Sequence, residues 1–366
     1  MEPVIQKNYD YKIDIIRAVA CLLVAIVHIS VPTWTNQISS TGFGVSDVFK
    51  SIIMCGWIGV PIFLFISGYS LAINKVSILN AEIDIIQFYK NRILRISPMW
   101  VICITVLIIS HKISGNTAIN LFIFQLQDLP ASTAFNIGWS LQLEFACYLL
   151  FPIFFIAIQK NNIKRIFCMV TFFIIMRLYV YYMPASAAIN WGYGSIFGGA
   201  VIFIAGMHTA KNPKLINNLK SKILLTVGIF SIIIYLYLVY IFGNWQNPEG
   251  RIGKYLIFFM PEIMSFCMIC VIKGYMTQPP DINTNINFIT KSLSYFGTIS
   301  YSAYLLSLFT NDLTSRVLSF IEPSGWISLI SYFILYLSFL VLISSLSYFG
   351  IEKPFLDLRK KDIIIK

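Results

Sequence analysis

The sequence predicts an all-α integral membrane protein, a polytopic bundle of about ten transmembrane helices. Hydrophobic residues make up 57% of its 366 residues and charged residues only 12%, whereas a soluble domain carries about 25% charged residues. Apolar runs long enough to cross a bilayer recur along the whole chain. A chain with so little polar surface is not a soluble protein.

Ten apolar runs approach the length of about 20 residues that a helix needs to cross the hydrocarbon core. The predicted spans are 13–34, 52–73, 96–111, 139–158, 164–183, 189–208, 223–242, 255–273, 294–312 and 327–349. The stretch 119–127 is apolar but too short, so we expect an interfacial or re-entrant segment there. The first run lacks a small-residue cleavage site and is interpreted as an uncleaved span.

Lysine and arginine predict the orientation. With both termini in the cytoplasm, the inner segments hold 20 of the 27 basic residues and the outer loops hold five, the other two lying within spans. This asymmetry follows the positive-inside rule. It also accounts for the net charge of +11 without a nucleic-acid partner, for which the sequence has no motif.

The seven cysteines all fall in apolar stretches, and Cys267 and Cys270 form a C-x-x-C without a second pair or a histidine nearby. We interpret them as packing residues and expect no metal site.

Ionisable residues inside the predicted spans, away from the span ends or in a membrane-facing motif, are costly in lipid and mark functional sites or structural pairs. They are Asp14, Arg17, His28, Glu144, Arg177 and Glu262. The predicted orientation places Asp14 and Arg17 near the inner face and the other four in the outer part. Glu144 could pair with Arg177, or it could lie beside His28.

Arg17 and His28 are predicted to share one face of the first helix. Eleven residues turn a helix by about 1100°, close to three full turns, and rise ~16 Å. Asp14, one turn before Arg17, can pair with it. Taken alone, Arg17 could simply extend to the inner interface, and His28 could be a buried, hydrogen-bonded histidine.

Six motifs follow one another along nearly the whole chain. The first is Arg17 with His28 after ten intervening residues. The others are LFISGYSL (64–71), FYKNRILRISPMW (88–100), GWSLQLEFACYLLFP (138–152), FGTISYSAYLLSLF (296–309) and IEKPF (351–355). In this order they resemble acyltransferase family 3, membrane-bound acyltransferases that modify bacterial surface or secreted glycans, such as O-antigen O-acetyltransferases.

Two departures from family patterns are visible. Many relatives have a histidine soon after the Tyr-Leu of the late motif, where this chain has Ser307. The chain also ends shortly after IEKPF, so we expect one transmembrane acyltransferase domain over 1–366 without the SGNH-type extracytoplasmic domain of some relatives.

The resemblance implies an enzyme of the bacterial inner membrane that takes an acyl group, most often acetyl, from cytoplasmic acyl-coenzyme A. No permanently bound cofactor is implied. Guanidinium groups bind phosphate well, so Arg17 is expected to bind the donor with Arg92 and Arg95 of the basic loop at 88–100. The two loop arginines could instead reflect topology alone. Ser67 and Gly68 lie at the same depth, although Gly68 could equally serve helix packing.

His28 is the implied general base, because imidazole exchanges protons near neutral pH. Glu144 is expected to orient it, as carboxylates do in triads, while Asp14, Arg177 and Glu262 support the site. A covalent acyl-histidine and direct transfer both remain open. The implied acceptor is a sugar hydroxyl of a glycan or lipid-linked glycan such as lipopolysaccharide O-antigen, and membrane lipids surround the protein.

Two other classes of protein fit part of the sequence. A transporter or flippase for a glycan or lipid-linked sugar would also have many spans and buried charges, but no repeated halves are visible in this chain. An envelope-assembly scaffold without activity would leave His28 without a role.

Overall fold

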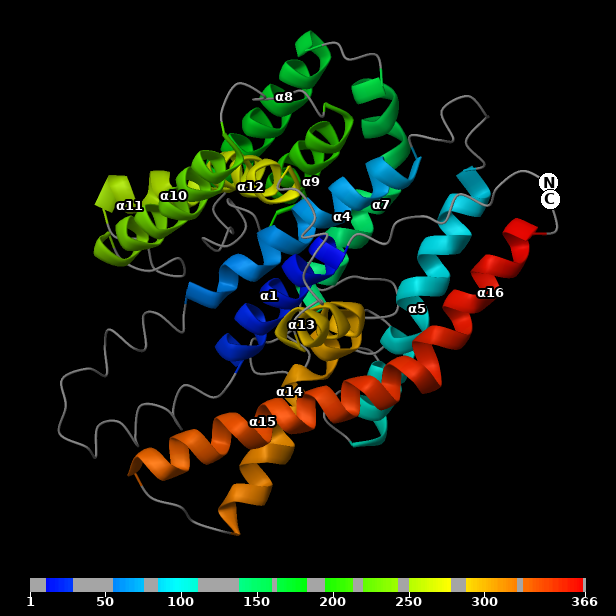
Figure 1. Cartoon of the computed structure of the whole chain (residues 1–366). Helices are drawn as coiled ribbons and strands as arrows, with labels where there is room; N and C mark the ends of the chain where they lie inside the picture. Colours follow the sequence, from blue (N-terminus) through cyan, green and yellow to red (C-terminus); the bar gives the residue numbers. More distant parts are fainter. Residues whose placement is uncertain are drawn as a thin grey trace.

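The computed structural model describes residues 11–28, 55–75, 85–110, 138–159, 163–182, 195–212, 220–242, 250–277, 288–320 and 325–364. Within these ranges every regular element is helical (Figure 1). The elements are α1 Tyr11–His28, η1 Cys55–Ile58, α4 Gly59–Lys75, α5 Ile85–Ile109, α7 Gly138–Gln159, α8 Ile163–Tyr182, α9 Ile196–Lys211, α10 Ser221–Ile241, α11 Gly250–Phe258, α12 Met260–Met276, α13 Phe288–Thr298, α14 Ser300–Ser319, α15 Gly325–Ser347, η4 Tyr348–Glu352 and α16 Lys353–Ile364.

The described helices make this a polytopic helical membrane protein. By length and composition, five of them could cross a membrane, or six if the bent pair α11 and α12 counts as one span. Each of the ten predicted spans overlaps a described helix or a pair of described helices. Some of these helices carry more than two charged residues, which is more than a span recognised by its composition alone would have. α1, with Lys12, Asp14 and Arg17, is one example. The all-α, polytopic class is confirmed, and the total of ten stays a prediction.

Three predicted elements differ from the structure or lie outside it. The chain over 88–100 is not a loop but part of α5, which begins at Ile85, well before the predicted span at 96. Beyond the last predicted span, a π-helix and α16 extend the C-terminal helix to Ile364. The stretch 119–127 lies outside the described residues.

The apolar outer faces of several helices fit a lipid environment. α10 buries few of its residues, and large side chains such as Phe230, Ile233 and Tyr237 are exposed on it. α4, in contrast, is mostly buried, so it lies inside the bundle. The share of buried residues thus distinguishes the helices that face lipid from those that lie inside the bundle.

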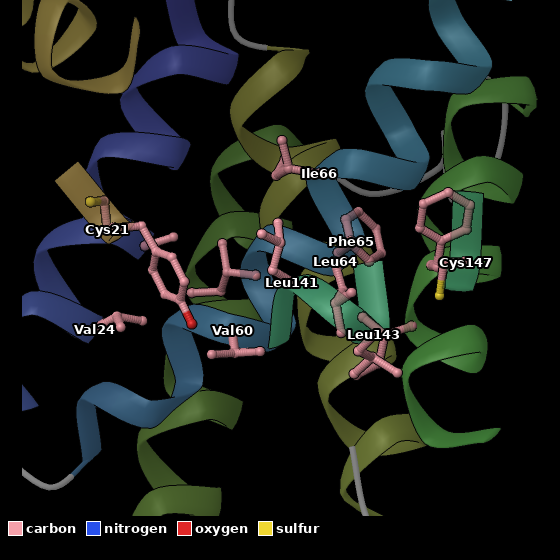
Figure 2. Close-up of a cluster of buried hydrophobic side chains, with 14 of the residues drawn as sticks. Cys21, Val24, Val60, Leu64, Phe65, Ile66, Leu141, Leu143 and Cys147 are labelled. Atoms are coloured by element: carbon pink, nitrogen blue, oxygen red, sulfur yellow. The ribbon is translucent and has the colours of Figure 1, made fainter. Parts of the chain in front are cut away.

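α1 lies in the interior, between α4 and α13 (Figure 1). Glycines allow these close approaches, because a Cβ on Gly59 would lie 2.3 Å from the carbonyl oxygen of Ala20, and one on Gly297 would lie 2.0 Å from that of Asp14. Figure 2 shows part of the buried core here, with Cys21 and Val24 on α1 and Val60 and Leu64 on α4. α1 is thus packed closely against α13 at Asp14 and against α4 at Ala20.

Candidate active site

A cavity lies among α1, α4, α5, α7 and the beginning of α14. Its empty space is about 680 Å³, counting the solvent at its open mouth. The charged side chains on its wall are Arg17, Arg95 and Glu144, and hydroxyl groups come from Ser67, Ser140, Tyr148 and Tyr304. Val60, Leu64 and Leu141, labelled in Figure 2, form part of its apolar wall.

Arg17 is held in the cavity wall by both ends of its guanidinium group. One nitrogen, Nη1, lies 3.1 Å from Asp14 Oδ1, and the other, Nη2, donates to Ser70 Oγ at 3.1 Å. The pairing with Asp14 confirms the expectation from their spacing of three residues. Asp14 is buried, with 3% of its surface exposed, whereas the Arg17 side chain is 22% exposed, so only the carboxylate side of this ion pair is shielded from water. Ser70 was not singled out in the sequence.

Arg95 reaches the cavity because it lies on the buried face of α5. The buried residues Phe88, Asn91, Met99 and Cys103 recur at helical spacing, and Arg95 falls midway between Asn91 and Met99. This pattern is also the reason that the predicted basic loop is a helix. The guanidinium of Arg95 lies within electrostatic range of Glu144 and Glu352.

Arg92 lies on α5 one turn from Arg95 but is not part of the cavity lining. The carbon at the centre of its guanidinium lies 5.8 Å from the ring centroid of Phe88 and 5.6 Å from that of Tyr148. Such cation–π contacts hold a guanidinium against aromatic faces. Of the two arginines of α5 that were expected to bind the donor, only Arg95 lines this cavity.

Glu144 lies inside the cavity and accepts hydrogen bonds from Ser67 and Tyr148. Tyr148 is one helical turn after Glu144 on α7, so the two side chains share a face. No hydrogen bond joins Glu144 to His28 in the part of the chain that the structure describes, and the described partner of Arg177 is not Glu144. Both sequence-based alternatives for the partner of Glu144 therefore differ from the hydrogen bonds observed here.

His28 ends α1 and lies outside the cavity lining, next to α14. Its Nδ1 atom is 3.3 Å from the hydroxyl oxygen of Ser307. Ser307 also donates to the backbone oxygen of Tyr304 at 2.9 Å, and the hydroxyl of Tyr304 contacts that of Ser140 on the cavity wall. His28 is thereby connected to the cavity through one turn of α14.

Gly68 faces α9 and serves helix packing. A Cβ at this position would lie 2.1 Å from the backbone oxygen of Phe203, and a Cβ on Gly206 would lie 2.1 Å from that of Phe65. The two glycines let α4 and α9 cross with their backbones in contact. The neighbouring Ser67 does line the cavity.

Arg177 and Glu262 form an ion pair away from the cavity, between α8 and α12. Arg177 is fully buried and donates a second bond to the backbone oxygen of Phe258 at 2.9 Å. Phe258 ends α11, where the chain bends by 56° before α12 begins. This pair joins α8 to the broken helix and is a structural element.

Glu352 of the motif IEKPF was overlooked as a site residue. It is buried and accepts a hydrogen bond from Ser302 of α14. Its side chain lies within electrostatic range of Arg95. A buried acid within an apolar helical segment was the available signal. The described residues contain no group of three metal-ligating side chains.

Comparisons with known proteins agree with the motifs. The model of acyltransferase family 3, described as an acyltransferase domain, matches residues 10–349. A protein of Acidianus two-tailed virus, named "Putative acetyltransferase ORF330", is 24% identical over 333 residues, which cover 85% of this chain and 86% of that protein. No solved structure matches the chain.

Proposed function

Because the chain belongs to acyltransferase family 3, a family of membrane acyltransferases, we propose that it is an O-acetyltransferase. In this proposal it moves an acetyl group from cytoplasmic acetyl-coenzyme A to a sugar hydroxyl of a glycan. The acceptor is a surface polysaccharide or its lipid-linked precursor, such as lipopolysaccharide O-antigen. The protein acts in the inner membrane of a bacterium, with both termini in the cytoplasm.

The observation that carries the proposal is the charge arrangement of the cavity. Two guanidinium groups, Arg17 and Arg95, line one cavity whose wall also reaches Tyr304, one turn before the partner of His28. Phosphates bind arginine through charge-assisted hydrogen bonds. We therefore assign Arg17 and Arg95 to the phosphates of the donor, with Arg92 adding positive charge beside them.

The length of α1 matches the proposed path of the donor. From Arg17 to His28 the helix rises ~16 Å, which is comparable to the reach of a pantetheine arm. A coenzyme held at Arg17 would present its thioester near His28. The donor would then bind from the cytoplasm while the acceptor approaches from the opposite side.

His28 acts as the general base of the proposed reaction. It takes the proton of the acceptor hydroxyl as the oxygen attacks the thioester carbon. The carbon–sulfur bond breaks, and the proton passes to the departing thiolate of coenzyme A. The acetyl ester remains on the sugar, so every atom and proton is accounted for.

Glu144 is proposed as a positioning residue of the donor cavity. Its hydrogen bonds go to Ser67 and Tyr148, and its charge lies within electrostatic range of Arg95. It fixes two hydroxyl groups and partly balances an arginine in an apolar setting, where an isolated charge is costly. Direct orientation of His28 is not part of this role.

The test is acetylation of a defined glycan. The chain is expressed in a bacterial host that makes one known surface polysaccharide, and the glycan mass is compared between wild type and His28→Ala. We expect an added acetyl group that disappears in the variant. Changed glycan export without acetylation in either strain would contradict the proposal and support a transporter.

A further inference from the structure

Ser307 is the described hydrogen-bonding partner of the imidazole of His28. It is completely buried on α14 and approaches Nδ1 at 3.3 Å. The same hydroxyl lies 2.9 Å from the backbone oxygen of Tyr304 in the preceding turn. One serine side chain thus connects the histidine to the backbone of a cavity-lining residue.

The hydrogen of this hydroxyl can serve only one of the two contacts. A serine hydroxyl has one donor and two acceptor sites, whereas a carbonyl oxygen can only accept. The shorter contact is to the carbonyl of Tyr304, so the hydrogen points there. The hydroxyl oxygen must then accept the bond from His28.

This arrangement determines which nitrogen of His28 carries the hydrogen. If Ser307 accepts, Nδ1 of the neutral imidazole is the donor and is protonated. Neutral imidazole has one donor nitrogen and one acceptor nitrogen, so Nε2 is left with its lone pair. The partner of one ring nitrogen commonly sets the state of the other.

We propose that Ser307 is a positioning residue that holds His28 in the Nδ1–H tautomer and leaves Nε2 free to take the proton of the acceptor hydroxyl. This proposal rests on the proposed role of His28 as the base. It assigns to Ser307 the orienting function that the sequence suggested for Glu144. After proton transfer, Ser307 continues to accept from Nδ1–H, so the imidazolium is stabilised without rearrangement.

The first test reads the tautomer directly and does not depend on activity. The chain has only three histidines, so the full-length protein in lipid bilayers can be labelled with ¹⁵N/¹³C-histidine and studied by solid-state NMR. The His28 signals are those absent in His28→Asn. We expect Nδ1–H at neutral pH, and an Nε2–H tautomer at His28 in the wild-type protein would overturn the proposal.

The second test separates positioning from packing. Ser307→Ala removes the acceptor, Ser307→Thr retains a hydroxyl, and Thr314→Val removes a buried hydroxyl whose described bond goes to the backbone of Thr310. Turnover of acetyl-coenzyme A is followed with the glycan acceptor of the host, together with the KM for acetyl-coenzyme A.

General-base catalysis supplies about 10²–10⁴-fold in rate, and we expect Ser307→Ala to lose roughly ten- to hundredfold of kcat with KM unchanged. Ser307→Thr should recover most of this loss, and Thr314→Val should behave as wild type. Equal losses in Ser307→Ala and Thr314→Val would show that packing alone is responsible. Wild-type protein with the Nδ1–H tautomer but no acetyl transfer would instead contradict the proposed function and leave the placement of Ser307 intact.

Discussion

The guanidinium of Arg17 bridges two helices, pairing with Asp14 on its own helix and donating to Ser70 on α4, both at 3.1 Å. A planar guanidinium can make both contacts at once and still offer donors to a ligand. The arginine is therefore oriented before any donor binds. This preorganisation gives Arg17 a specific place in the cavity, which simple extension to the membrane interface would not provide.

Replacing Arg17 by lysine is expected to weaken binding of acetyl-coenzyme A. Lysine keeps the positive charge opposite Asp14 but loses the fork that reaches Ser70 and a phosphate together. A charged hydrogen bond contributes about 1.5–3 kcal/mol, so the Kd should rise roughly ten- to hundredfold. Calorimetry on the purified protein measures this, with the exposed Arg316→Lys as control. An unchanged Kd in Arg17→Lys would remove Arg17 from the donor site.

Replacing Glu144 distinguishes a positioning role from a catalytic one. Glu144→Gln retains an oxygen that can accept from Ser67 and Tyr148 but removes the negative charge near Arg95. We expect acetyl-coenzyme A to bind at least as tightly as in wild type, and acetyl transfer to continue. Loss of transfer as complete as in His28→Ala, with binding intact, would make Glu144 a catalytic residue.

Substituting Gly68 by alanine is expected to destabilise the protein. The added Cβ would lie 2.1 Å from the backbone oxygen of Phe203. The backbones of two packed helices cannot easily shift to relieve this clash. Overpacking of this kind costs about 1–3 kcal/mol. Thermal unfolding in detergent should show a lower midpoint than for Gly350→Ala, since a Cβ on Gly350 has nothing within 4 Å. Equal midpoints would contradict a packing role for Gly68.

The ion pair of Arg177 and Glu262 is expected to support stability and not chemistry. Removing one partner of a buried pair typically costs about 3–5 kcal/mol, because the other charge is left unpaired. Arg177→Met and Glu262→Met should each unfold at lower temperature, and the double variant should recover part of the loss. Binding of acetyl-coenzyme A by the folded double variant should match wild type. A specific loss of binding there would place the pair in the site.

Sequence reasoning identified contacts between residues that lie one helical turn apart. The pairing of Asp14 with Arg17 follows from their spacing of one helical turn. Arg95 was expected at the donor site from the family resemblance, but in a predicted loop that the structure shows to be part of α5. Partners from distant helices could not be obtained in this way. Ser307 lies 279 residues from His28 along the chain, and no pattern within either helix indicates which of many polar side chains meets the imidazole.

The role of Gly68 likewise could not be predicted from the sequence alone. Gly68 stands beside Ser67 in one motif, and the sequence could not say which of them faces a ligand. Their neighbouring positions point to different sides of α4, so only Ser67 lines the cavity while Gly68 contacts α9. The apolar segment around Glu352 could have indicated a buried acid, but its partner Ser302 lies on another helix and could not be predicted from the sequence.

The most direct test of the account is a structure of the full-length protein in a lipid nanodisc with a non-hydrolysable acetyl-coenzyme A analogue, determined by electron cryomicroscopy. The account predicts phosphate groups at Arg17 and Arg95, with the pantetheine arm in the cavity and the acetyl group directed to His28 and Ser307. An analogue bound elsewhere, or one whose acetyl group lies at the opposite end of the cavity from His28, would contradict it.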